Sequence, residues 1–151
     1  MRVLIVCTGN TCRSPMAEAL LKRALAGEGL TNIQVASAGT GAWEGAPASE
    51  GAYLVSLEQG LYLSGHRAQL LTPELVDQAD LVLTMSRPHL ARVRELGGGA
   101  RAHLLGEFAG HTGPGGEVND PFGADLEEYR ATFQAIAAML PSVLARLLGA
   151  G

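Results

Sequence analysis

The opening of the chain alternates between apolar and polar stretches in a pattern typical of a strand–helix–strand unit. Residues 2–6 form a continuous apolar run, which predicts a buried strand. Residues 7–13 are small and polar, and a helix is expected next, with Ser14 as its N-cap and Pro15 at its first position. Residues 33–37 predict a second strand. The helix between the two strands carries an apolar stripe of Met16, Leu20, Leu21 and Leu25, and ends at Gly27 and Gly29.

The alternation continues along the rest of the chain. Helices are expected over residues 47–60, 73–78 and 87–96, and strands over 81–83 and 101–105. Strands that alternate with helices are typical of an open parallel sheet with helices on both faces. The sequence therefore predicts an α/β fold.

The last part of the chain predicts a loop followed by a long helix. Residues 106–119 are rich in glycine and are expected to form a long loop. The final helix is expected to start near Asp125, which suits its N-cap, and Pro141 should kink or break it. Its core-facing stripe is expected to consist of Leu126, Tyr129, Phe133, Ile136, Leu140, Val143, Leu144 and Leu147.

Length and composition indicate one globular domain spanning residues 1–151. Hydrophobic residues make up 47% of the chain and charged residues 17%, with a net charge of −4. This charge offers no electrostatic basis for binding nucleic acid or an anionic membrane. The apolar runs are too short to suggest a membrane span or a signal peptide, and two cysteines in one short loop suggest a reducing compartment. We therefore expect a cytoplasmic protein.

The turn after the first strand carries the most specific chemistry. It reads Cys7-Thr8-Gly9-Asn10-Thr11-Cys12-Arg13-Ser14, a C-x5-R-S pattern between a strand and a helix N-terminus. Backbone N–H groups and the helix dipole favour an anion there, and the Arg13 guanidinium matches two phosphate oxygens. In an open α/β sheet, ligands bind beyond the carboxyl ends of the strands, where this turn lies. The pattern predicts a phosphate site that includes Thr8, Gly9, Asn10, Thr11, Cys12 and Ser14.

Cys7 is the candidate nucleophile of this site. The positive environment of the turn favours its thiolate, and the Ser14 hydroxyl could donate to the sulfur. The alternative is a buried small apolar residue at the end of a strand. The turn lacks the G-K-[ST] ending of a Walker loop, which argues against a nucleoside triphosphate.

Four segments resemble the low-molecular-weight protein tyrosine phosphatases. The run VCTGNTCRSPMAE from Val6 to Glu18 resembles the signature of that family, and Asp120-Pro121-Phe122 resembles its general-acid motif. Ser37-Ala38-Gly39-Thr40 and Gly65-His66 match in order. The resemblance covers nearly the whole chain. It implies a four-stranded parallel sheet of order 2-1-3-4 and a phosphocysteine mechanism on phosphorylated proteins or peptides, with phosphate as the product.

The resemblance also implies a role for each catalytic residue. Cys7 would attack phosphorus, Arg13 and the loop amides would hold the phosphoryl oxygens, and Asp120 would protonate the leaving group and later activate water. No metal or other cofactor is expected. The alternative for Asp120 is a structural turn, because Asp-Pro is a common turn dipeptide. Asp125 is its nearest rival as the acid.

Other residues are expected around this centre. Asn10, Ser14, Ser37 and His66 resemble a polar network that braces the loop, although His66 could also be a surface histidine. Trp43 and Phe122 are candidate walls of the pocket mouth, or else ordinary packing residues. Cys12 would either form a reversible disulfide with Cys7 that protects the nucleophile, or simply pack.

The expected substrate is phosphotyrosine, with phosphoarginine as a close competitor. Thr11 stands where tyrosine-directed relatives often carry a larger aliphatic residue, and Gly123 stands where they carry a second aromatic. Both changes reduce the apolar surface for an incoming ring, and Thr11 resembles the branch that acts on phosphoarginine. Two rival functions use the same loop. An arsenate reductase of the thioredoxin-coupled type would need further cysteines, which are absent after Cys12. A phosphocysteine carrier would need neither Asp120 nor Arg13 in these roles.

Overall fold

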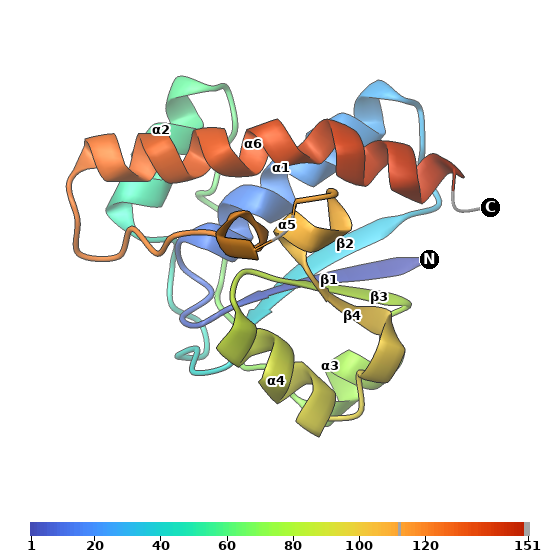
Figure 1. Cartoon of the computed structure of the whole chain (residues 1–151). Helices are drawn as coiled ribbons and strands as arrows, with labels where there is room; N and C mark the ends of the chain where they lie inside the picture. The colour runs from blue at the N-terminus through green and yellow to red at the C-terminus, as the bar shows by residue number, and fades with distance from the viewer. Residues whose placement is uncertain (112, 150–151) are drawn as a thin grey trace.

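The computed structural model describes residues 1–111 and 113–149 and shows a four-stranded parallel sheet (Figure 1). Its strands are β1 (Arg2–Cys7), β2 (Gln34–Gly39), β3 (Leu81–Thr84) and β4 (Ala102–Leu104), in the order β2-β1-β3-β4. All three neighbouring pairs are parallel. The expected sheet and its order 2-1-3-4 are confirmed. Residue 112, inside the expected loop, and residues 150–151, at the end of the expected domain, lie outside the described residues.

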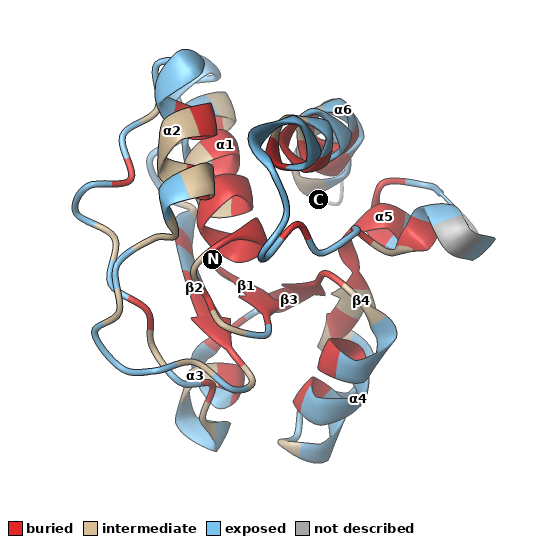
Figure 2. Ribbon diagram, turned by 90° about the vertical axis from the view of Figure 1, so that its left-hand side faces the viewer, coloured by how far each residue is buried: buried red, intermediate tan, exposed pale blue. Residues whose placement is uncertain are grey.

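Helices cover both faces of the sheet, as expected. Figure 1 shows α1, α2, α5 and α6 on one side of the sheet and α3 and α4 on the other. Buried apolar residues form one cluster on each side, and the buried positions face the sheet (Figure 2). The helices are α1 (Arg13–Gly27), α2 (Glu50–Glu58), α3 (Pro73–Gln78), α4 (Arg87–Glu95), α5 (Leu105–Phe108) and α6 (Leu126–Gly149), with short 3₁₀ turns η1 (Gly99–Arg101) and η2 (Gly113–Gly116).

Several element boundaries differ from those that the sequence predicts. The helix expected over residues 47–60 is shorter, because Ser49 caps α2 by accepting a hydrogen bond from the Ala52 N–H at 3.4 Å. The stretch 106–119 is not a simple loop, since it contains most of α5 and all of η2. The glycines of this stretch allow close packing: a Cβ at Gly106 would lie 2.5 Å from the Gly115 carbonyl oxygen.

The first helix begins differently from the prediction. It starts at Arg13, and its N-cap position is Cys12, which forms no side-chain cap bond. Ser14 is therefore not the N-cap. Its buried hydroxyl lies 2.9 Å from the Cys7 sulfur instead. The Ser14 side chain thus contacts the end of β1 rather than a backbone N–H of its own helix.

The last helix runs through Pro141, where a kink or a break was expected, and it is not broken there. Leu140 and Val143, on either side of this proline, are buried in the apolar cluster where α6 packs on α1, and this packing holds the helix together across the proline. Asp125 caps its start by accepting from the Glu128 N–H at 3.0 Å. Leu126 is exposed and does not join the buried stripe. By length and composition α6 could cross a membrane, but a core helix passes the same test, so this is weak evidence.

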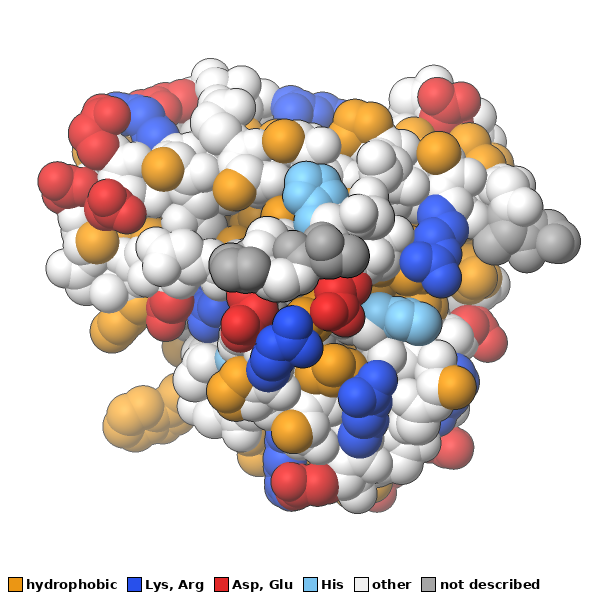
Figure 3. Space-filling model, in the orientation of Figure 1, with side chains coloured by type: hydrophobic (Ala, Val, Ile, Leu, Met, Phe, Trp, Pro, Cys, Tyr) orange, Lys and Arg blue, Asp and Glu red, His pale blue; other side chains and the backbone are white. Residues whose placement is uncertain are grey.

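Charged side chains of both signs are interspersed on the surface (Figure 3). Arg87 lies 3.5 Å from Glu107 and 3.9 Å from Glu117, and Arg130 lies 2.7 Å from Glu58. These pairs are at least one third exposed, and such surface pairs contribute little to stability. The fold therefore depends mainly on the two apolar clusters.

Candidate active site

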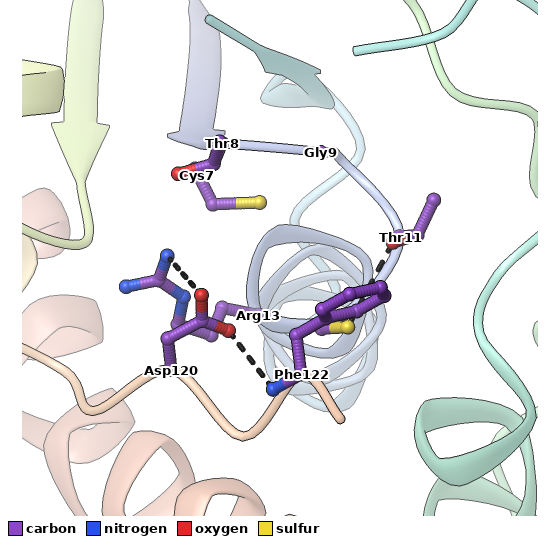
Figure 4. A pocket seen from close by; sticks show the side chains of 8 residues that line it. Cys7, Thr8, Gly9, Thr11, Arg13, Asp120 and Phe122 are labelled. Carbon is purple, nitrogen blue, oxygen red and sulfur yellow. Dashed lines mark hydrogen bonds and ion pairs between the residues drawn. The ribbon is translucent and has the colours of Figure 1, made fainter. Parts of the chain in front are cut away.

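One cavity of about 170 Å³ lies at the carboxyl end of β1, where the chain turns into α1. The residues that line it come from the first turn and from the segment before α6. Figure 4 shows the Cys7 sulfur, the Arg13 guanidinium and the Asp120 carboxylate around this space. The complete lining is Cys7, Thr8, Gly9, Thr11, Cys12, Arg13, Asp120 and Phe122. The tertiary structure thus brings the Asp-Pro-Phe segment to the turn from more than 100 residues away.

The hydrogen bonds of Ser14 direct a proton toward Cys7. The Asn10 amide Nδ2 donates to the Ser14 hydroxyl oxygen at 2.8 Å, and this oxygen lies 2.9 Å from the Cys7 sulfur. Because the serine oxygen accepts from Asn10, its own proton is available for the sulfur. The Cys7 sulfur also lies near the N-terminus of α1, which favours negative charge. Both features favour negative charge at this position.

Asn10 is the centre of the polar network behind the turn. It is fully buried and adopts a left-handed conformation with φ of 56°, which asparagine tolerates well. Its Nδ2 also donates to the Ser37 hydroxyl at 2.9 Å, its Oδ1 accepts from the Gln69 N–H at 2.9 Å, and its carbonyl accepts from His66 Nε2 at 2.6 Å. Ser37 donates onward to Glu18 at 2.5 Å. The four residues expected to form a polar network lie together here.

Arg13 and Asp120 form an ion pair at the cavity. The distance between Arg13 NH2 and Asp120 Oδ2 is 3.6 Å; the arginine side chain is 5% exposed and the aspartate 50%. Arg13 also donates to the Val118 carbonyl at 3.0 Å, which fixes the direction of its guanidinium. Asp120 Oδ1 accepts from the Phe122 N–H at 3.1 Å, so the same carboxylate also closes a turn. A structural turn and a position at the cavity are therefore compatible.

The second cysteine of the turn, Cys12, contacts two hydroxyl groups from other parts of the chain. The Cys12 sulfur is 3.2 Å from the Ser49 hydroxyl and 3.5 Å from the Tyr129 hydroxyl. Burial, followed by the hydrogen bond with Cys12, raises the pKa of Tyr129. Cys7 and Cys12 are both free thiols in this structure. Tyr129 belongs to the buried stripe of α6, as expected, and also reaches Cys12.

The two aromatic residues expected at the pocket mouth differ in position. Phe122 lines the cavity and is 72% exposed. Trp43 is not among the residues that line the cavity and is 86% exposed. Hydrogen bonds from Gly45 N–H to the Ala68 carbonyl and from Ala68 N–H to the Ala46 carbonyl, both 2.8 Å, tie the segment after Trp43 to another part of the chain. The tryptophan ring is left facing solvent.

A histidine that sequence reasoning missed contacts the turn. His89 Nε2, from α4, lies 2.7 Å from the Thr8 hydroxyl oxygen. Burial lowers the pKa of His89 to about 4; the nearby Arg13 charge acts in the same direction, while Asp120 and Glu117 oppose it. The sequence offers only a weak local indication, the Ser86-x-x-His89 spacing of a capping box, with no hint of its contact with Thr8.

A metal centre is not formed by the described parts of the chain. Within residues 1–111 and 113–149, no three His, Cys, Asp or Glu side chains lie close enough together to hold an ion. The chemistry that this arrangement can support uses a thiolate, a guanidinium and a carboxyl group.

Comparison with known protein families identifies the family of this chain. Residues 2–149 match the family described as low molecular weight phosphotyrosine protein phosphatase. The chain belongs to this family. Its members include protein tyrosine phosphatases, so the chain is a phosphatase-type hydrolase, and the sequence resemblance is confirmed.

Relatives of the low-molecular-weight phosphatase include enzymes named for two substrates. The chain is 39% identical to the protein-arginine-phosphatase of Bacillus subtilis, over 97% of each chain. It is 38% identical to the low molecular weight protein-tyrosine phosphatase A of Mycobacterium tuberculosis, over 95% of this chain and 89% of the relative. A solved structure of the YwlE arginine phosphatase, a cysteine-to-serine mutant with a phosphorylated active-site serine, has a TM-score of 0.87 and 37% identity, covering 99% of this chain and 96% of the other.

Proposed function

We propose that the phosphatase hydrolyses phosphorylated protein side chains through a phosphocysteine intermediate at Cys7. The observation that carries this proposal is the cavity shared by the Cys7 sulfur, the Arg13 guanidinium and the Asp120 carboxyl group. The thiolate attacks phosphorus and forms an S–P bond as the bond to the leaving group breaks. Asp120 gives its proton to the leaving group. Water then attacks phosphorus while Asp120 takes its proton, so an O–P bond forms as the S–P bond breaks, which releases phosphate and restores the thiolate.

The loop around Cys7 supplies the charge stabilisation that this reaction needs. Backbone N–H groups of residues 8–13 lie at the N-terminus of α1, where the helix dipole favours a dianion. The Val118 carbonyl accepts from NH1 of Arg13, which orients the guanidinium toward the cavity. The remaining N–H groups of Arg13 would bind two equatorial oxygens of the phosphoryl group. Ser14 would donate to the sulfur when it leaves in the second step.

The role of each residue is tested with an activated aryl phosphate and three variants. Cys7→Ser should lose activity by at least about a thousandfold, because a serine hydroxyl is a much weaker nucleophile here. Asp120→Asn should lose about a hundredfold on an alkyl phosphate and clearly less on the activated aryl phosphate, whose leaving group needs no proton. Asp125→Asn is the matched control, because Asp125 caps α6 and does not line the cavity. Equal losses for Asp120→Asn on both substrates would contradict the general-acid role.

Among phosphoprotein substrates, we propose phosphoarginine as the preferred one, with phosphotyrosine as the competitor. Thr11 lines the cavity, and among the described residues Phe122 is the one aromatic side chain in its lining. A wall that carries a hydroxyl group binds a polar guanidinium better than it binds an apolar phenyl ring. Asp120 could pair with the guanidinium of the substrate as the P–N bond breaks. The full-length similarity to a protein-arginine-phosphatase supports the same choice.

The substrate choice is tested by comparing kcat/KM on matched phosphoarginine and phosphotyrosine peptides. We expect wild type to favour phosphoarginine and Thr11→Ile to shift the ratio toward phosphotyrosine by about tenfold, since the added apolar surface binds a ring. Thr11→Ser, which keeps the hydroxyl, is the control and should leave the ratio nearly unchanged. Absence of phosphoarginine turnover by wild type would refute the preference.

The same proposal includes a reducing, cytoplasmic location and distinguishes two rivals. A free thiol nucleophile works only where it stays reduced. A phosphocysteine carrier would retain the phosphoryl group, so rapid loss of labelled phosphate from wild type separates hydrolysis from carriage. Reduction of arsenate coupled to thioredoxin should be undetectable, because Cys7 and Cys12 are the chain's two cysteines and neither lies in a relay beyond the loop.

A further inference from the structure

The first residue after the nucleophile is held by a histidine of α4, which covers the face of the sheet opposite to α1 (Figure 1). Thr8 follows Cys7 directly, and its hydroxyl oxygen lies 2.7 Å from Nε2 of His89, which is 81 residues away in the sequence. His89 belongs to α4 and is only 3% exposed. On its other side, the Thr8 carbonyl accepts from the Gly41 N–H at 2.9 Å. Thr8 is thus anchored by two different segments of the chain.

The hydrogen bonds of His89 determine its tautomer. The backbone N–H of Ser86 points at Nδ1 at 3.1 Å, and the Ser86 hydroxyl lies 2.9 Å from the same nitrogen. A backbone N–H can only donate, so Nδ1 is the acceptor and carries no proton. A neutral imidazole then carries its proton on Nε2. His89 therefore donates to Thr8, and the threonine oxygen accepts.

We propose that His89 is a positioning residue for the phosphatase reaction, holding Thr8 and through it the start of the phosphate loop. Thr8 is joined to Cys7 by one peptide bond and lines the cavity, so a shift of Thr8 also moves the sulfur and the adjacent backbone N–H groups. Alignment of these groups determines the rate, because small displacements of reacting atoms cost large factors in catalysis. The inference rests on the proposed function of Cys7.

The low pKa of His89 is consistent with this role. A protonated imidazole would have to give up the hydrogen bond from Ser86, since both ring nitrogens would then be donors. The buried ring, with Arg13 nearby and with Asp120 and Glu117 opposing, stays neutral at working pH. The neutral ring therefore keeps the Ser86 contact, which fixes the tautomer that donates to Thr8.

Two isosteric variants separate this role from simple capping of α4. Asparagine places an oxygen where His89 has Nδ1, so His89→Asn keeps the contact with the Ser86 N–H and loses the contact with Thr8. Glutamine places an N–H donor near the position of Nε2, so His89→Gln keeps the contact with Thr8. Thr8→Val removes the acceptor at nearly constant size. His103→Asn is the control on β4, because the His103 ring packs on Phe108 and does not line the cavity.

The measurement is kcat and KM for p-nitrophenyl phosphate, with urea unfolding of each variant. We expect His89→Asn to lower kcat by about threefold to tenfold, the effect of one hydrogen bond, with KM within about twofold. Thr8→Val should cause the same loss, the double variant should lose no more than either single one, and His89→Gln should recover most of kcat.

Several results would overturn the proposal. They are full kcat for His89→Asn, equal losses for His89→Asn and His89→Gln, or additive losses in the double variant with Thr8→Val. Failure of the proposed function is recognised separately, because wild type would then not hydrolyse the aryl phosphate or Cys7→Ser would retain activity.

Discussion

The neutral state of His89 makes the stability of the fold depend on pH. Burial of the ring is the main reason why its pKa falls to about 4 from the ordinary value of 6.5. The charge of Arg13 lowers it further, and the carboxylates of Asp120 and Glu117 partly oppose this effect. The unfolded chain takes up a proton near pH 6.5, whereas the folded chain takes it up only near pH 4. Stability from this group is therefore complete above pH 6.5 and is lost as the pH falls.

The size of the loss follows from the two pKa values. At pH 5 the unfolded histidine is almost fully protonated and the folded one almost fully neutral, which costs about 2 kcal/mol relative to pH 7. The loss levels off below about pH 4, where both states are protonated. His103, whose pKa is lowered by burial and by Arg146, contributes in the same direction. A measurement on wild type alone would therefore mix two histidines.

The assay is urea unfolding at pH 7 and pH 5 for wild type and His89→Gln. The difference between the two proteins isolates His89, since His103 and the carboxylates are common to both. We expect wild type to lose about 2 kcal/mol more than the variant between the two pH values. Urea is preferred to guanidinium, which would screen the charges around the ring. If both proteins lose the same stability, the buried neutral histidine is not the cause and this reasoning is refuted.

Two further predictions concern glycines that contact the site. Gly51 lies in α2, and alanine normally stabilises a helix relative to glycine. In Gly51→Ala, however, the added Cβ would lie 2.5 Å from the Tyr129 ring. We expect Gly51→Ala to lower the free energy of unfolding in urea by about 1–3 kcal/mol. Gly65→Ala is the control and should be nearly neutral, because its added Cβ would have no atom within 4 Å. A stabilised Gly51→Ala variant would refute the contact. Gly39→Ala would place its Cβ against the Thr8 carbonyl oxygen; kcat for an aryl phosphate should fall at least about tenfold, and wild-type kcat would show that the loop tolerates the change.

The local chemistry of the site could be derived from the sequence. The phosphate loop is built from consecutive residues, Cys7 to Ser14, between an apolar run and a helical stripe. Consecutive N–H groups next to a helix N-terminus favour an anion, so the composition of this segment is sufficient to predict an anion site. The parallel sheet followed from the alternation of strands and helices. The sheet order and the role of Asp120 came from the family resemblance.

Other features depend on packing between distant segments. A local pattern suggested Ser14 as an N-cap and a kink or break at Pro141, and the structure shows neither that N-cap nor a break. In both cases tertiary contacts oppose the local preference: the Ser14 hydroxyl contacts the Cys7 sulfur, and the buried residues of α6 keep the helix continuous.

His89 shows the same limit most clearly. Its contact with Thr8 joins residues 81 positions apart on α4 and on the turn after β1. The sequence determined that a phosphate loop would form, because that loop needs only neighbours along the chain. Which residues hold the loop in place was decided only when the helices packed on the sheet, because that contact depends on the position of α4 relative to β1.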